Sequence, residues 1–263
     1  MAKAPSSEIT ILEISEGSVT ANIIGTQPLI FNRMSEKAKR ALLLPAGRKT
    51  SADRAATQKH DCIQEYRDSV YRYSTDDRPT RLRFPSAAIK AAMATAALDL
   101  PGTKKSEVGR LLWCQGESVD FYGVPKVLIS VVRSADMNKT PDIRTRAIVA
   151  EWACTVEIHF VRPKLNATTV ARLLAAGGVT CGIGDFRQEK GKGNYGQFRV
   201  CDPDDPDFLR IVETGGRAAQ DAALHHYECY DEDSREMMDW YNEEILRRRD
   251  APPPARKTKA RAA

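Results

Sequence analysis

Glycine is concentrated between residues 175 and 200, where seven glycines stand in AAGGVTCGIGDFRQEKGKGNYGQFRV. Because glycine adopts positive φ and lets other atoms approach its backbone closely, this density predicts a loop of unusual geometry. Arg187, Lys190 and Lys192 lie between the two glycine clusters. Bare amides and cations in one loop favour a polyanion, so we interpret the loop as one that contacts the phosphates of a single-stranded nucleic acid. A flexible hairpin with solvated lysines is the alternative interpretation.

The formal charge of the 263-residue chain is +5, and it is distributed unevenly. The first 200 residues carry 30 Lys and Arg against 20 Asp and Glu; residues 201–246 carry 14 acids against three arginines; residues 247–263 carry seven cations against one acid. A basic first part is typical of nucleic-acid binding. The acidic segment could pack against the basic face of its own chain or of a neighbouring subunit, so head-to-tail electrostatic assembly is one hypothesis.

Several classes of protein are not favoured by the sequence. No apolar run is long enough to span a membrane and the N-terminus has no apolar segment, so a cytoplasmic location is expected. The six cysteines are scattered without a C-x-x-C pair, which indicates neither a disulfide framework nor a zinc ribbon. The clusters HDC at residues 60–62 and HHYEC at residues 225–229 lie in separate segments, so no metal site and no cofactor are expected.

The chain before residue 80 contains one strand pattern and two helix patterns. Residues 1–17 are interpreted as a flexible N-terminus that includes a short strand-like run. Residues 18–24 are rich in β-branched side chains and predict a strand, and Ser35 is the predicted N-cap of the helix that follows. Residues 45–79 begin polar and basic and then become helix-like over residues 62–73. We interpret residues 45–79 as an insertion that emerges from the core.

The middle of the chain predicts a helix and a long hairpin. A short strand over residues 80–84 precedes an alanine-rich helix over residues 85–98, with Ser86 as its N-cap. Residues 119–160 are interpreted as two strands joined by a basic connection. Residues 147–160 alternate apolar and polar side chains and predict a single long strand with one face in water.

The last part of the chain surrounds the glycine loop. Asn166 is the predicted N-cap of a helix over residues 167–176, which Gly177 is expected to end. After the loop come a strand over residues 196–200, an acidic helical extension over residues 201–246 and a disordered basic tail over residues 247–263.

Without the insertion and the tail, residues 18–200 give the order strand, helix, strand, helix, two long strands, helix, glycine loop, strand. This order is close to the split β-α-β arrangement with four antiparallel strands. The sequence therefore predicts an α+β fold whose antiparallel sheet core is RRM-like or ferredoxin-like, with a helical insertion and a basic hairpin. Sheets of this kind commonly present one face to RNA.

Two segments carry a resemblance to a known family. RLRFPSAAIKAAMATAA, at residues 81–97, resembles a hallmark of the RAMP superfamily, which has a strand, a Pro-x-Ser-like turn and a helix with an early lysine. GGVTCGIGDFRQEKGKGNYGQFRV, at residues 177–200, resembles that superfamily's C-terminal glycine-rich loop. The order of the elements resembles the backbone subunits of CRISPR effector complexes. The resemblance implies a palm-like RRM core and a thumb-like insertion that together grip a few nucleotides of guide RNA, in subunits that polymerise along it.

The resemblance implies most of the nucleic-acid-binding residues that we predict. They come from the palm, the thumb-like insertion, the helix motif, the hairpin and the glycine loop; Lys190 and Tyr195 are added from the loop sequence, Tyr195 as a side chain that could stack on bases. The predicted nucleic-acid-binding residues are Arg33, Lys37, Arg48, Lys49, Ser86, Lys90, Arg144, Arg146, Gly182, Gly184, Arg187, Lys190, Gly191, Lys192, Gly193 and Tyr195. Phe198 is expected to pack beneath the loop. Ala87 and Ala91 stand where the family usually has glycine.

The sequence and the resemblance together bear on catalysis. Target-cleaving members of the family's type III branch carry a catalytic aspartate in the loop after the first strand. That loop reads GTQPLIFNR at residues 25–33 and contains no acid, so no catalytic residue and no ribonuclease activity are expected. The predicted function is non-catalytic binding of single-stranded nucleic acid, with RNA favoured, by a protein that assembles in rows along the strand.

The expected partners are single-stranded RNA or DNA, other copies of the chain and other subunits of an effector complex. A stand-alone, phage-encoded member fits the motifs equally well. Three alternative functions stay open. A single-stranded DNA-binding or annealing protein of phage replication or recombination would use the same surface. A RAMP-type endoribonuclease would need an acidic or histidine cluster at the palm, and His159 is the candidate base. A structural mimic would instead dock into another complex through its acidic segment.

Overall fold

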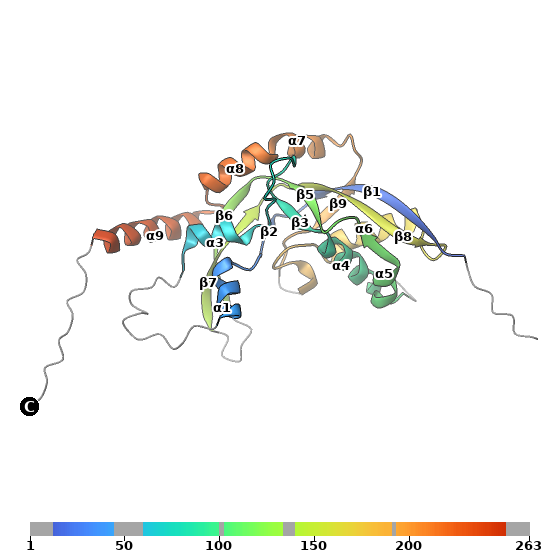
Figure 1. Ribbon diagram of the computed structural model, residues 1–263, viewed down its shortest axis with the longest axis horizontal. Coiled ribbons are helices and arrows are strands. Elements are labelled where there is room, and N and C mark those ends of the chain that lie inside the picture. Colours follow the sequence, from blue (N-terminus) through green and yellow to red (C-terminus); the bar gives the residue numbers. More distant parts are fainter. Residues whose placement is uncertain (1–12, 45–59, 100–102, 134–139, 191–192, 251–263) are drawn as a thin grey trace, which may run out of the picture.

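The computed structural model describes residues 13–44, 60–99, 103–133, 140–190 and 193–250 (Figure 1). The central elements, in chain order, are β1 (Ser15–Gly25), α4 (Ser86–Ala96), β5 (Ser118–Tyr122), β8 (Ala153–Arg162), α6 (Ala167–Thr180) and β9 (Phe198–Cys201). The strands are ordered β5-β8-β1-β9 across the sheet, and each neighbouring pair is antiparallel. A β-α-β-β-α-β chain with this strand order is ferredoxin-like, so the predicted α+β fold class is confirmed.

Short elements complete this six-stranded sheet. β3 (Arg83–Pro85) pairs with the outer edge of β5, and β4 (Leu112–Cys114) pairs with β8. The helices α4 and α6 lie side by side against one face, and η1 (Ala97–Asp99) and α5 (Lys105–Leu111) follow α4 (Figure 1). The alternate side chains of β8 that point into the core are Cys154, Val156, Ile158 and Phe160. The period-two pattern of this strand therefore builds the core as predicted.

A second, three-stranded sheet consists of β2 (Leu29–Ile30), β7 (Pro141–Val149) and β6 (Pro125–Arg133), in that order across the sheet. The prediction of one strand over residues 147–160 was therefore wrong, because β7 ends in this sheet and β8 begins in the other. Between them Trp152 is fully buried, with its ring stacked 5.4 Å from that of Phe121. Its Nε1 donates a 2.9 Å hydrogen bond to the carbonyl of Gln27. This buried ring fills the junction of the two sheets, and the chain bends around it.

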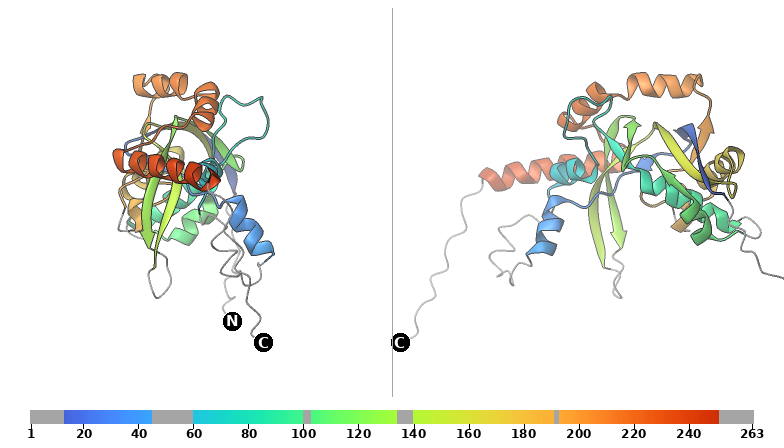
Figure 2. Two further views of the ribbon diagram at one scale, coloured as in Figure 1. Left: turned by 90° about the vertical axis from the view of Figure 1, so that its left-hand side faces the viewer. Right: turned by 45° about the vertical axis from the view of Figure 1, so that its right-hand side comes forward.

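The hairpin of β6 and β7 projects from the six-stranded sheet (Figure 2). It is shorter than the hairpin predicted over residues 119–160, because β5 and β8 belong to the six-stranded sheet. At its base Val127 and Leu128 are buried, whereas Val131 near the tip is 73% exposed. The apolar run of β6 is thus buried only where the hairpin meets the rest of the protein.

Two helices flank this hairpin. α1 (Glu36–Leu43) begins as predicted at Ser35, whose hydroxyl accepts a 3.2 Å hydrogen bond from the backbone N of Ala38. α3 (Cys62–Ser69) packs against β7. Tyr66 of α3 is fully buried, and its hydroxyl donates to the carbonyl of Pro125 over 3.0 Å. The second half of the proposed insertion is therefore part of the core; residues 45–59 lie outside the described residues.

The start of α4 differs from the prediction. Pro85 occupies the N-cap position, and no side chain caps the helix. Ser86 is instead the first helical residue; it is buried, and its hydroxyl donates a 2.5 Å hydrogen bond to the carbonyl of Gly116. The prediction of Ser86 as N-cap was wrong, because this hydroxyl holds the loop before β5 rather than the helix amides.

The helix α6 begins at Asn166, as predicted, but continues through Gly177 and Gly178 to Thr180. A Cβ atom on Gly178 would lie 2.2 Å from the carbonyl oxygen of Phe198 in β9. A Cβ atom on Gly177 would lie 3.0 Å from the backbone of Ala92 in α4. The two glycines let α6 pack closely on its neighbours, so the prediction that Gly177 ends the helix was wrong.

The acidic C-terminal segment forms α7 (Pro206–Thr214), α8 (Arg217–His225) and α9 (Glu232–Asp250). α8 is fixed to the central sheet by Gln220, a fully buried side chain that accepts hydrogen bonds from the backbone N atoms of Arg81 and Leu82 over 2.7 and 2.8 Å. α9 lies along β6, where the hydroxyl of Ser234 accepts a 2.9 Å hydrogen bond from the N of Ile129. Part of the acidic segment therefore folds against its own chain.

Candidate nucleic-acid interface

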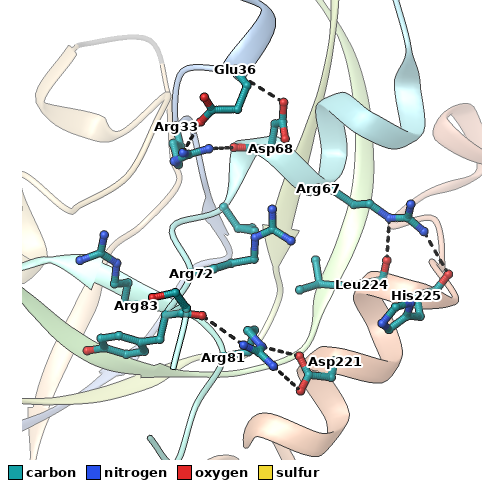
Figure 3. Close-up of a pocket in the computed structure, with 13 residues that line it drawn as sticks. Arg33, Glu36, Arg67, Asp68, Arg72, Arg81, Arg83, Asp221, Leu224 and His225 are labelled. Carbon is teal, nitrogen blue, oxygen red and sulfur yellow. Dashed lines mark hydrogen bonds and ion pairs between the residues drawn. The ribbon is translucent and has the colours of Figure 1, made fainter. Parts of the chain in front are cut away.

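Three hollows adjoin one another at Asn32 and Arg33, in the connection between β2 and α1. The loop hollow, of about 330 Å³, lies between the glycine loop and α4 and includes Asn32. The hairpin hollow, of about 440 Å³, includes both residues and lies beside β7. The arginine cleft, of about 540 Å³, includes Arg33 and reaches α8 (Figure 3). We call the three hollows together the palm groove.

The glycine loop is held in a defined shape at the edge of the palm groove. Gly182 and Gly184 have φ values of 69° and 89°, which other residues rarely adopt. The backbone N of Asp185 donates to the carbonyl of Ile30 over 2.9 Å, and the N of Ile183 donates to Gly196 over 2.9 Å. The described part of the loop is therefore tied to β2 and closed on itself. The alternative of a flexible hairpin does not describe this part.

Arg146 joins the glycine loop to the hairpin from inside the protein. Its side chain is 8% exposed, and its guanidinium pairs with the carboxylate of Asp185 in the loop. Its Nη2 also donates to the hydroxyl of Ser130 over 2.8 Å. Burial lowers the pKa of Arg146, and the charge of Asp185 opposes that shift. Arg146, which was predicted to bind nucleic acid, therefore lies at the floor of the hairpin hollow with its guanidinium bonded to side chains of the protein.

Of the three loop cations, Arg187 is the one whose side chain the structure describes. It lines the loop hollow, where its Nε donates to Glu189 over 2.7 Å and its Nη1 donates to the carbonyl of Gly184 over 3.0 Å. Lys190 lies in the short helix η2 (Gln188–Lys190). Gly191 and Lys192 are outside the described residues.

The aromatic residues of the loop pack against one another and the hairpin. The ring of Tyr195 lies 6.2 Å from that of Phe186, and Tyr195 is partly buried on the cluster that includes Ile148. Gly193 is buried beside Phe186, where a Cβ atom would collide with the carbonyl. Phe198 is 1% exposed and belongs to the main core cluster, where it lies against Trp152 and Gly178. Phe186, at 49% exposure, is the more accessible ring.

The helix motif does not place its lysine in the palm groove. Ala88, Ala91 and Ala92 are the residues of α4 that line the loop hollow. Residues three and four apart share one face of a helix, so Lys90 points elsewhere. It lies near Cys114 of β4, whose pKa its charge influences. The structure therefore brings neither Lys90 nor the buried Ser86 beside Arg187, in contrast to the grouping that the sequence indicated.

The remaining predicted residues are divided between the hairpin hollow and the surface. Arg33 and Arg144 line the hairpin hollow, and Arg144 is exposed. Arg144 and Arg146 belong to the strand β7 rather than to the polar connection of the hairpin. Lys37 is exposed on α1. Arg48 and Lys49 lie outside the described residues.

Besides the predicted Arg33, the arginine cleft contains four cations that the sequence interpretation missed. These are Arg67, Arg72, Arg81 and Arg83, and the acids of the cleft are Glu36, Asp68 and Asp221. A signal for two of them was present, because RLRF alternates cations with the buried Leu82 and Phe84. Arg72 faces this strand through an isolated antiparallel bridge to Leu82. No local pattern connects Arg67 on α3 with this group.

Four of these arginines donate to acceptors of the protein. Arg67 donates from Nε to the carbonyl of Leu224 over 2.9 Å, and Arg81 donates from Nε to Asp221 over 2.7 Å. Arg83 donates from Nη1 to the hydroxyl of Ser118 over 3.1 Å. Arg33 donates from Nη1 to the carbonyl of Asp68 over 3.2 Å and from Nη2 to Glu36 over 2.5 Å.

The two central strands of the sheet present no lysine or arginine on its open face. Across its two central strands the outward pairs are Ser18–His159, Thr20–Glu157 and Asn22–Thr155. His159 lies between two carboxylates, with Nδ1 2.5 Å from Glu16 and Nε2 3.3 Å from Glu157. Because acids here would repel phosphates, the palm groove is a better candidate for nucleic acid than the sheet face expected for an RRM-like protein.

The described residues also show how metal-binding side chains and cysteines are arranged. No group of three or more His, Cys, Asp or Glu side chains there could hold a metal ion. All six cysteines are free thiols, and burial raises the pKa of each, that of Cys114 to about 11. Within the same residues, no helix combines the length and the apolar character needed to cross a bilayer.

No family profile and no curated protein sequence matches the chain. Solved structures that are similar to it include a type III-B Cmr-beta complex bound to cognate target RNA, at 11% identity and a TM-score of 0.37. That match covers 70% of this chain and 59% of the other, less than two thirds of its length. Cmr6 from Pyrococcus furiosus matches at 8% identity and a TM-score of 0.35, over 71% of this chain and 99% of Cmr6. At these values, the ferredoxin-like assignment depends on the strand order of this chain itself.

Proposed function

We propose that this chain is a non-catalytic protein that binds single-stranded nucleic acid along the palm groove. The observation that carries the proposal is the convergence of three hollows at Asn32 and Arg33, which brings together cations from four segments: the palm, the glycine loop, the hairpin and residues 67–83. Phosphate contacts from arginines supply most sequence-independent affinity for nucleic acid. Tyr71, which lines the loop hollow, offers a ring on which a base could stack.

RNA is the favoured strand in this proposal. The support is the resemblance of residues 81–97 and 177–200 to the motifs of an RNA-binding superfamily, together with a ferredoxin-like core of the kind that RRM proteins use. A single-stranded DNA-binding or annealing protein is the alternative. The two differ in one chemical group, since only RNA offers a 2′-hydroxyl.

The test is binding of a labelled RNA and of the DNA with the same sequence, measured by fluorescence anisotropy over a range of salt concentrations. We expect tighter binding of the RNA. The plot of log affinity against log salt has a negative slope. The triple variant Arg33→Gln, Arg144→Gln, Arg187→Gln should make this slope less steep by about 2, because each phosphate contact on a single strand contributes about 0.7.

A matched control removes three exposed cations that do not line the palm groove, by the changes Arg110→Gln, Lys164→Gln and Arg172→Gln. If the control triple reduced the steepness of the salt dependence as much as the groove triple does, the groove would not be the binding surface. Equal affinity for RNA and DNA would favour the alternative of a DNA-binding protein.

An endoribonuclease is the second candidate, and one observation favours it. His60 lines the hairpin hollow beside Arg33, with Nδ1 2.9 Å from Glu65 and Nε2 3.2 Å from Asp142. A histidine held by carboxylates is a common general base. The labelled RNA of the binding test should nevertheless stay intact during incubation. Cleavage that disappeared in His60→Ala would establish the nuclease instead.

Assembly in rows is part of the proposal, with a second copy of the chain as the partner. Leu42 and Leu43 on the basic helix α1 are 71% and 79% exposed. An apolar groove of about 210 Å³ lies between α9 and the hairpin and includes Trp240, which is 59% exposed. The acids of α9 complement the cations of α1, so we assign the groove to the α1 leucines of a neighbouring copy.

A further inference from the structure

The arginine cleft ends at α8 rather than continuing as an open channel of cations. Its walls are the end of α3, residues 72–74, Arg81 and Arg83 at the start of β3, and one turn of α8 (Figure 3). Five guanidinium groups and three carboxylates line it, so its lining carries a net positive charge.

Arg72 occupies the middle of this group (Figure 3). The other four arginines each donate to an acceptor of the protein. Arg72 makes no hydrogen bond and no ion pair with any residue that the structure describes. The donors of its guanidinium are therefore unused by the described part of the chain and can serve a ligand.

The surroundings of Arg72 favour an anionic ligand. The side chain reaches solvent, yet the neighbouring atoms remove enough water from the guanidinium to lower its pKa. The charge of Asp68 opposes that shift, and the charges of Arg33, Arg81 and Arg67 add to it. Like charges gathered in this way repel one another until an anion lies among them. A phosphate group would relieve that repulsion and accept the free donors of Arg72.

The negative charge of the far wall favours the end of a nucleic-acid strand in the cleft over the interior of one. Asp221 on α8 forms this wall, and Asp76 lies beyond it, bonded to Arg81 and Arg217. A strand that ran through the cleft would bring its next phosphates against these carboxylates, whereas a strand that ended there would not. A terminal phosphate monoester also carries a charge of about −1.5 to −2 near neutral pH, against −1 for an internal phosphodiester.

We propose that the arginine cleft, centred on Arg72, binds the terminal phosphate monoester of a single strand whose backbone lies in the palm groove. The inference rests on the proposed function and adds to it the recognition of one end of the strand. It gives the binding a polarity, because the strand can end at α8 and must leave past the glycine loop or the hairpin.

The test compares three short RNAs of one sequence that carry a 5′-phosphate, a 3′-phosphate or hydroxyls at both ends. The full chain should bind one of the two phosphorylated RNAs about tenfold more tightly than the hydroxyl-ended RNA. Arg72→Gln should abolish this preference, so that the variant binds all three RNAs with equal affinity. Arg72→Lys, which keeps the charge but not the fork of donors, should retain part of it.

Arg78→Gln is the matched control. Arg78 is exposed near the cleft without lining it, and it pairs with Asp120 and lies over the ring of Tyr73. This variant should keep the preference in full. Equal binding of all three RNAs by the unmodified chain would overturn the inference and leave the proposed function intact, as would a preference that survived in Arg72→Gln. Failure of every RNA to bind would overturn both.

Discussion

Arg146 connects the glycine loop to the β6–β7 hairpin through an ion pair whose arginine is buried and whose carboxylate is 32% exposed. Its guanidinium pairs with Asp185, and its Nε is buried without a hydrogen-bond partner in the part of the chain that the structure describes. A charge in this position stabilises the protein only while its partner is present. The side chain therefore acts through the position of the loop, and a ligand in the hairpin hollow would meet Arg144 before it met Arg146.

This difference leads to a prediction for single substitutions. Arg146→Gln should lower the free energy of unfolding by about 2 to 3 kcal/mol, because it leaves the Asp185 carboxylate without its counter-ion. Arg144→Gln, on the exposed side of the same strand, should change it by less than about 0.5 kcal/mol. Urea denaturation followed by circular dichroism measures both. Equal effects of the two substitutions would contradict the buried ion pair.

Glycine within a helix usually weakens it, and α6 contains two glycines in its last turns. The two glycines allow α6 to pack closely, because α6 crosses α4 at Gly177 and lies on β9 at Gly178. The loop that follows α6 starts from this close contact. The spacing between α6 and β9 therefore determines where the glycine loop lies beside the palm groove.

A prediction at this scale compares two glycine-to-alanine changes in helices. Gly178→Ala should destabilise the protein by about 1 to 2 kcal/mol, since its Cβ would lie 2.2 Å from the carbonyl oxygen of Phe198 and force the helix to move. Gly109→Ala in α5 should stabilise it by up to about 1 kcal/mol, because the nearest described atom to its Cβ would be that of Ala94 at 3.8 Å.

Thermal unfolding of the two variants measures the difference. Both changes gain the same helix propensity, so a melting temperature that rose in Gly178→Ala as much as in Gly109→Ala would show that α6 and β9 are not in close contact.

Among the residues that the structure describes, α1 and the α9 groove present exposed apolar side chains in surroundings of opposite charge. If these surfaces join neighbouring copies, binding to a long RNA should be cooperative and should place one subunit on a constant number of nucleotides. Leu43→Asp should reduce this cooperativity, because it puts a carboxylate of α1 against the acids of α9.

Electrophoretic mobility and analytical ultracentrifugation with long single-stranded RNA measure the stoichiometry and the cooperativity. Leu209→Asp is the control, since Leu209 is a half-exposed leucine on α7, outside both surfaces. Loss of cooperativity in the control alone, or undiminished cooperativity in Leu43→Asp, would contradict the assigned contact.

The sequence by itself determined the order of the elements, the α+β class and the features that depend on neighbours within a few residues. Ser35 and Asn166 cap their helices as predicted because each cap is a bond to an amide three positions along the chain. The alternation in β8 gave the correct buried face because one side of that strand packs on helices. The glycine loop was also found at its predicted place, since its turns need positive φ at Gly182 and Gly184.

Only the tertiary structure decided which of the predicted residues share a site. The contacts of Trp152 with Phe121 and Gln27 divided a strand that alternation alone had made continuous. The crossing of α6 over α4 placed alanines, and not Lys90, beside the glycine loop. The arginine cleft needed α3, residues 72–83 and α8 to meet. These outcomes depend on contacts between residues far apart in sequence, which no local periodicity or motif contains.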